Sequence, residues 1–310
     1  MKSTFWPHSV HPYSLFRAIT NEPRISVSQL ARNWNVNRKT AEIWYRNAIR
    51  KRIIIPPILR KKSFANFREY IHFFRVSDPH LTFEQLKNEK GIKYFSIQAG
   101  FANLEVISDS PLGKGLGDLV IGGYRSDYYV SIPPNCTFMK SVSMIEKKLS
   151  DIDDTKNDSS PLISRDIPYE PWNRLDEGIF GELDDELRKP FAHVLRITGA
   201  YSDKVMDFFR RKDEFSHTIT MFFPDGEKSY LLSVYLIRTK NDSLLIDLFS
   251  IFPASTVFYR LKEYLIMNIY TPFVMDYPAG YIIKKTLSHL KKKELVEDFT
   301  NSIVEYYFRP

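Results

Sequence analysis

Apolar residues between positions 24 and 50 recur at spacings of three and four, the period of a helix with one buried face. Leu30 and Ala31 fall in the middle of a short first helix that Ser26 or Ser28 would cap. Val36 would plug the following turn, and Asn37 would cap a second helix. The apolar face of that second helix consists of Ala41, Trp44, Tyr45, Ala48 and Ile49. The pattern predicts a helix-turn-helix.

The opposite face of the second helix is polar and basic, which is what a helix that enters a DNA groove needs. Ile53, Ile54 and Ile55 would form a wing strand that turns at Pro56-Pro57, with further cations behind it. The residues expected to contact DNA are Asn37, Arg38, Lys39, Thr40, Arg46, Arg50, Lys51, Arg52, Arg60, Lys61 and Lys62. The alternative is an ordinary small helical domain with a solvated basic face.

After Glu69 the period becomes that of strands, with aromatic and β-branched residues in short runs. The runs predict strands at 70–76, 92–99, 101–108 and 128–132, with a helix near Thr82 and a glycine-rich stretch at 111–123. This order is that of a split βαβ, ferredoxin-like unit.

The same succession of elements returns after residue 171. We therefore predict an α+β chain with two copies of a winged helix-turn-helix followed by a ferredoxin-like βαββαβ domain. The predicted segments are a winged helix at 1–62, a ferredoxin-like domain at 68–135, a linker at 136–170, a second, degenerate winged helix at 171–227 and a second ferredoxin-like domain at 228–310.

The two copies differ in net charge. The first 70 residues hold fourteen Lys and Arg against three Asp and Glu, a charge of +11, so the other 240 carry −4 of the total of +7. Residues 171–228 hold nine cations and twelve anions, and Asp203 and Asp207 lie on the second candidate recognition helix, where they would repel phosphate. DNA contact is therefore expected from the first copy, and the second copy is interpreted as structural.

Each copy resembles a member of the Lrp/AsnC (feast/famine) family of transcription regulators. Residues 175–183 resemble the start of that family's domain, with Leu175-Asp176, Ile179 and Leu183 in place and Gly178 where a second Asp is usual. Residues 99–106 resemble the hairpin of the family's sensing (RAM) domain, and residues 261–266 are a looser version. The resemblance covers nearly the whole chain except the linker.

The resemblance implies a sequence-specific regulator that binds duplex DNA as a homodimer or higher oligomer. It also implies a small-molecule effector such as an amino acid, held near Gly100, Asn103 and Ser108. The alternative is an assembly protein whose winged domains bind protein or non-specific nucleic acid.

No pair of residues has the spacing of a nucleophile and its base, so we expect no enzyme, no cofactor and no metal. Cys136 is the single cysteine, and no apolar run has transmembrane length. We therefore expect a cytoplasmic protein without a membrane partner.

Overall fold

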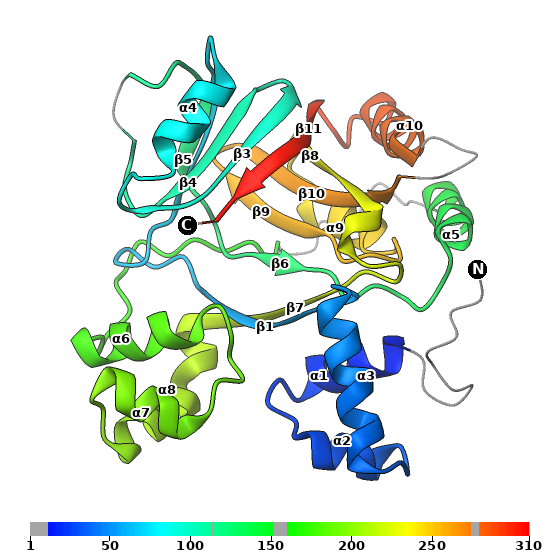
Figure 1. Ribbon diagram of the computed structural model, residues 1–310. Helices are drawn as coiled ribbons and strands as arrows, with labels where there is room; N and C mark the ends of the chain where they lie inside the picture. Colours follow the sequence, from blue (N-terminus) through cyan, green and yellow to red (C-terminus); the bar gives the residue numbers. More distant parts are fainter. Residues whose placement is uncertain (1–11, 113–114, 152–159, 274–278, 310) are drawn as a thin grey trace.

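The structure is a computed structural model that describes residues 12–112, 115–151, 160–273 and 279–309. Figure 1 shows two helical units beneath a large curled sheet, with a two-stranded ribbon between them. The chain is thus a mixed α+β fold with a curled antiparallel sheet.

The first helical unit is built from three helices that end in a strand. They are α1 (Pro12–Asn21), α2 (Val27–Asn33), α3 (Arg38–Arg50) and β1 (Ile54–Lys61). Both predicted caps are confirmed, because Ser26 accepts a hydrogen bond from the backbone N–H of Gln29 and Asn37 accepts one from Thr40. The second unit repeats the arrangement with α6 (Arg174–Leu183), α7 (Phe191–Thr198), α8 (Ser202–Phe215) and β7 (Ser216–Phe222).

The curled sheet has nine strands in the order β5-β2-β4-β3-β11-β8-β10-β9-β6. Its first half contains β2 (Tyr70–Arg75), α4 (Pro79–Leu86), β3 (Ile92–Gly100), β4 (Leu104–Ser108) and β5 (Asp118–Tyr124). Its second half contains β8 (Tyr230–Arg238), α9 (Asp242–Phe249), β9 (Val257–Leu261), β10 (Tyr264–Pro272), α10 (Ala279–Lys292) and β11 (Asp298–Phe308), with β6 (Tyr129–Val130) at the edge. A short 3-10 helix, η1 (Glu227–Ser229), precedes β8.

The two halves pair within one chain. β3 pairs with β11, and Arg125, just after β5, forms a bridge with Leu261 of β9. The sheet therefore curls round until its two ends meet. The favoured prediction of pairing between chains loses its basis here, because the partner of each half is the other half.

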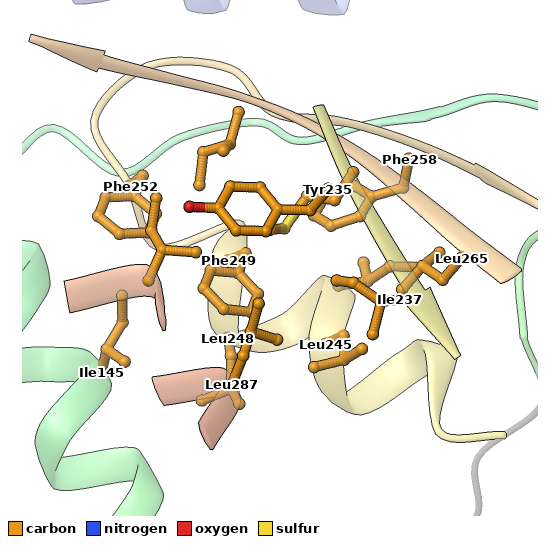
Figure 2. Packing of buried hydrophobic residues seen from close by; sticks show 14 of the residues in the cluster. Ile145, Tyr235, Ile237, Leu245, Leu248, Phe249, Phe252, Phe258, Leu265 and Leu287 are labelled. Atoms are coloured by element: carbon orange, nitrogen blue, oxygen red, sulfur yellow. The ribbon is translucent and has the colours of Figure 1, made fainter. Parts of the chain in front are cut away.

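Helices cover the outer face of the sheet. α4 lies over the first half, and α9, α10 and α5 (Phe138–Ser150) lie over the second. Figure 2 shows the second of these layers, where Phe249 of α9 lies beside Tyr235 of β8 and Leu287 of α10 lies near Leu248 of α9. α5 lies inside the range predicted as an exposed linker. It folds because Phe138, Val142 and Ile145 are spaced as one apolar face and are buried in this layer.

The inner face packs on itself. Ile71 and Phe73 of β2 belong to the same buried cluster as Tyr259 of β9 and Ile266 of β10. Residues that alternate with the outer positions on these strands therefore point into the curl.

β1 and β7 form the ribbon, so each helical unit gives its strand to the other. Leu59 of β1 is buried in the core of the second unit, and Phe222 of β7 is buried in the core of the first. The prediction of a wing turned at Pro56-Pro57 is wrong. Both prolines lie inside β1, where the register with β7 shifts between Ile55 and Ile58, because proline has no N–H to donate to a partner strand.

Asp225 and Gly226 do not close a hairpin among the described residues, because β7 pairs with β1. No helix among the described residues is long and apolar enough to cross a lipid bilayer.

Candidate active site

Glu105 is a carboxyl group in the interior of the curled sheet. It follows Leu104 on β4, and since Leu104 packs beneath α4, Glu105 points to the inner face. Its side chain is 2% exposed. Ser96, its cross-strand partner on β3, donates a hydrogen bond of 3.1 Å to Glu105 Oε2, and Gln98 Nε2 donates one of 2.7 Å.

Burial raises the pKa of Glu105 to about 7, because the desolvated carboxylate is held by only these neutral donors. Near neutral pH the group is therefore divided between acid and carboxylate. A buried carboxyl with this pKa can deliver a proton, which an ordinary surface glutamate does not do at pH 7.

Further polar atoms lie on the same inner face without a hydrogen-bond partner among the described residues. They are Gln98 Oε1, Tyr259 Oη and Asn268 Oδ1. Tyr259 and Tyr94 have pKa values well above the usual range, through burial first and then the charge of Glu105. Both phenols remain protonated and can donate. Buried polar atoms without partners are uncommon, and each needs an explanation such as a bound water or a functional role.

A cluster of cations and tyrosines lies where the inner face approaches the ribbon. This rim cluster is defined by charges that act on one another's pKa values, and it consists of Arg52, Arg60, Tyr270, Tyr307 and Arg309. The ring of Tyr307 stacks on Tyr94 with centroids 5.9 Å apart. Figure 1 places the end of the chain between the sheet and the β1–β7 ribbon.

Electrostatics joins the rim cluster to Glu105. Arg309 lowers the pKa of Tyr94 that Glu105 raises, so Tyr94 lies within reach of both charges. Arg309 also lowers the pKa of Arg60, after the larger effect of burial. The only hydrogen bond found for the Arg60 guanidinium within the described residues goes to the carbonyl of Leu59, at 3.0 Å. Arg60 is thus a half-buried cation, and no carboxylate of the described residues lies within ion-pairing distance of it.

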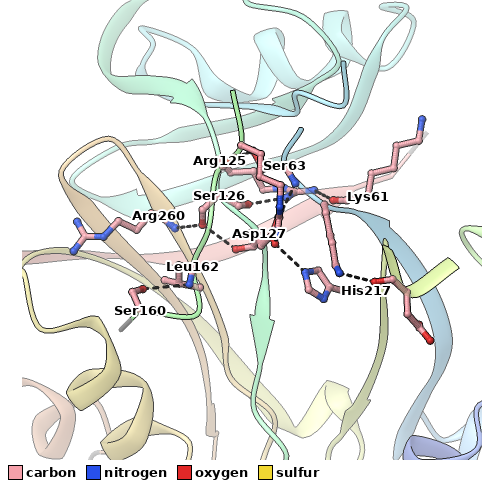
Figure 3. Close-up of polar contacts among 12 residues, drawn as sticks. Lys61, Ser63, Arg125, Ser126, Asp127, Ser160, Leu162, His217 and Arg260 are labelled. Atoms are coloured by element: carbon pink, nitrogen blue, oxygen red, sulfur yellow. Dashed lines mark hydrogen bonds and ion pairs between the residues drawn. The ribbon is translucent and has the colours of Figure 1, made fainter. Parts of the chain in front are cut away.

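A buried polar network holds the ribbon against the sheet (Figure 3). Asp127 accepts a hydrogen bond of 2.6 Å from the backbone N–H of Ser63 and two from Arg165, at 3.0 and 2.9 Å. Arg125 bonds to the Lys61 carbonyl and forms an ion pair with Glu69. Burial alone would raise the pKa of Glu69, but Arg125 outweighs it and holds the value at about 2. These contacts fix the positions of Lys61 and Arg60 on β1.

The residues predicted to contact DNA fall into two groups. Arg38, Lys39, Arg46, Arg50 and Lys51 lie exposed on or just after α3, and Asn37 and Thr40 form its first turn. Arg52, Arg60, Lys61 and Lys62 instead belong to the ribbon region. Arg52 forms an ion pair with Glu227, and Lys62 donates to the Asp213 carbonyl.

Lys61 is enclosed by the second helical unit. Its ammonium group lies over the rings of Phe67, Trp172 and Phe180 and 2.7 Å from Glu177 Oε2. The structure therefore does not bring the predicted cations to one surface.

The predicted effector residues are engaged in the fold. A side chain at Gly100 would meet the Asn301 carbonyl of β11 at 2.3 Å, so this position needs glycine for close strand approach. Asn103 exchanges hydrogen bonds of 2.8 Å with the backbone of Val76, and Ser108 donates to the Ser110 carbonyl.

Sequence reasoning did not single out Glu105, Ser96 or Gln98. A signal was present, since Ser96 and Gln98 alternate with Phe95 and Ile97, and Glu105 interrupts an otherwise apolar strand. No group of His, Cys, Asp and Glu among the described residues could hold a metal ion.

Comparison with protein-family models and with curated proteins gives no match. A crystal structure of the siroheme decarboxylase NirDL shares the fold, with a TM-score of 0.54 and 9% identity over 96% of this chain and 92% of that one. A second NirDL structure, in complex with an iron-uroporphyrin III analogue, matches over the same shares with 11% identity and a TM-score of 0.45.

The prediction of an Lrp/AsnC transcription regulator is contradicted, because the solved structure that shares the fold over nearly the whole chain is that of a siroheme decarboxylase and not of a regulator. Four further expectations are set aside with it: binding of duplex DNA, an amino-acid effector, the assembly-protein alternative and the expectation of no enzyme. The physical reason lies in the ribbon. β1, the predicted wing, is paired with β7, and four of the predicted DNA-contacting cations are held there.

Proposed function

We propose that this protein is an enzyme that binds a tetrapyrrole bearing several carboxylate side chains and releases carbon dioxide from it. The observation that carries the proposal is Glu105, a buried carboxyl with a pKa of about 7 on the same inner face as unpartnered polar atoms. The fold shared with a siroheme decarboxylase supports the reaction class.

The proposal also covers the ferredoxin-like order of the strands and the division of the chain into segments. Each half of the sheet has its strands in the order fourth-first-third-second, which is the ferredoxin-like order, and each is preceded by a three-helix unit ending in a strand. We propose the five segments 1–62, 68–135, 136–170, 171–227 and 228–310 as the divisions of the chain. In this division, α5 forms part of the linker.

The rim cluster fits the substrate's periphery. A siroheme-type ring is flat and carries anionic side chains around its edge. Arginine is the side chain best suited to carboxylate, and Arg60 and Arg309 offer guanidinium groups to it. The stacked rings of Tyr94 and Tyr307 offer an aromatic surface beside these cations.

Glu105 supplies the proton that the reaction needs. When a side chain –CH2–COO⁻ loses carbon dioxide, the bonding electron pair stays on its carbon and must take up one proton to give –CH3. The acid form of Glu105 gives that proton and is restored from solvent. No other reactant is required by this balance.

The test combines binding and turnover on the full chain. Iron-uroporphyrin III is titrated by its visible absorbance, and released carbon dioxide is measured. We expect Glu105→Gln to keep binding and lower the rate about 10²–10⁴-fold, the usual contribution of a general acid. A matched control, Arg46→Met on α3, leaves both unchanged. Absence of binding by the wild-type protein would overturn the proposal, as would an unchanged rate in Glu105→Gln.

A further inference from the structure

A second polar site lies on the other side of the ribbon, apart from the inner face of the sheet. It is a surface pocket of about 310 Å³ that we call the ribbon pocket. The lining comes from the end of α1, the end of β1 and the α8–β7 junction. The lining residues are Thr20, Asn21, Pro23, Lys62, Lys212, Asp213, Ser216, His217 and Thr218.

The ribbon pocket is rich in hydrogen-bond donors and positive charge. Lys62 donates a hydrogen bond of 2.5 Å to the Asp213 carbonyl, and it forms no ion pair among the described residues. Lys212 forms an ion pair with the Asp213 carboxylate and donates a hydrogen bond of 3.2 Å to Thr218 Oγ1. Asp213 is the one acidic residue in the lining and points largely to solvent, with 78% of its side chain exposed. The lining therefore has more cations than anions.

The His217 ring lies beside a buried carboxylate. Its Nε2 lies 3.3 Å from Oδ2 of Asp127, a carboxylate only 3% exposed. Burial alone would raise the pKa of Asp127, but hydrogen bonds from His217, the Ser63 N–H and Arg165 lower it below its ordinary value. Asp127 therefore stays ionised, and its charge lies beside the His217 imidazole, which lines the ribbon pocket.

We propose that the ribbon pocket binds a phosphate group, either inorganic phosphate or the phosphate of a small metabolite. Two ammonium groups suit a phosphate, whose several oxygens accept point charges from different directions. A carboxylate prefers the fork of an arginine, and the residues that line the ribbon pocket include no arginine. The volume admits a phosphate monoester. This proposal does not depend on the reaction at Glu105.

The experiment is a thermal-shift titration of the full chain with inorganic phosphate at constant ionic strength. A ligand that binds the native state raises the melting temperature with its concentration, so we expect a saturable rise in the wild-type protein. Lys62→Met and Lys212→Met should lose most of this rise. Lys228→Met is the matched control, since Lys228 is exposed on η1 away from the pocket, and it should keep the full response.

A second measurement does not depend on how the lysine variants fold. The imidazole NMR signals of the seven histidines are recorded, and the signal missing in His217→Gln is assigned to His217. Phosphate should move that signal saturably, with the concentration dependence of the thermal shift, and acetate should not. The inference is overturned if phosphate leaves the His217 signal in place, if acetate moves it equally, or if Lys62→Met responds like the wild type.

Discussion

The two halves of the curled sheet have the same strand order but different inner faces. Glu105 in the first half and Ile266 in the second each follow an outward-facing leucine, Leu104 or Leu265, on the later strand of a hairpin. The first position carries a carboxyl with serine and glutamine donors, and the second carries an apolar side chain opposite Tyr259. A shared backbone therefore explains the fold, whereas the difference between the halves marks where chemistry is expected.

Coverage of the outer face also differs. The second half packs against three helices, and the first half against α4 alone. Burial of more apolar area stabilises the second half, so it serves as the scaffold. The first half can then keep a buried carboxyl, which costs stability, because the scaffold offsets that cost.

The largest effect is expected when a carboxyl group is placed at the matching position in the second half of the sheet. Ile266→Glu would place a carboxylate inside the apolar cluster of the inner face, and we expect a loss of about 3–5 kcal/mol in the free energy of unfolding. Chemical denaturation measures it. Ile266→Val is the control and should cost about 0.5–1.5 kcal/mol. Equal effects of the two substitutions would mean that the inner face of the second half tolerates charge as the first does.

A smaller effect is expected at the rim cluster. Arg60→Met or Arg309→Met removes a guanidinium that we propose to contact a substrate carboxylate. A hydrogen bond to a charged group is worth about 1.5–3 kcal/mol, so binding of iron-uroporphyrin III should weaken about 10–100-fold. Absorbance titration measures it. Arg50→Met, a cation on α3, is the matched control. If Arg50→Met weakens binding as much, the effect is one of overall charge only.

Stability should depend on pH in opposite directions at two buried glutamates. The pKa of Glu105 is raised to about 7 in the folded chain, so the native state binds more protons than the unfolded state between pH 4.5 and 7. Its contribution to stability is present at low pH and is lost as pH rises through this window, by about 1.4 kcal/mol per pH unit.

Glu69 has the reverse sign. Its pKa of about 2 means that its contribution is present above pH 4.5 and is lost as pH falls towards 2. Denaturation of Glu105→Gln should therefore show a flatter profile from pH 4.5 to 7, and Glu69→Gln a flatter one below pH 4.5. A Glu105→Gln profile parallel to the wild type across pH 4.5–7 would show that this carboxyl titrates normally.

The sequence predicted both caps of the first helical unit, because capping is decided by neighbouring residues. The pairing of β1 with β7 was not predictable in this way. It joins Leu59 to the core of a unit more than a hundred residues away, and no local pattern specifies that partner.

The site escaped prediction for a related reason. The positive charge of the first 70 residues favoured α3 as the functional surface, but charge on an exposed helix is compatible with many partners. The properties that distinguish Glu105 are burial and the lack of a cation beside it, and both depend on how the two halves close.

Single-turnover reaction of iron-uroporphyrin III in deuterated water tests the central claim most directly. Carbon dioxide and product are followed by mass spectrometry, with wild-type and Glu105→Gln protein compared at saturating substrate. The account predicts one deuterium incorporated for each carbon dioxide released by the wild type, and release slowed at least about 100-fold in the variant. Equal rates in the two proteins, or a product that keeps all its carboxylates in the wild type, would contradict it.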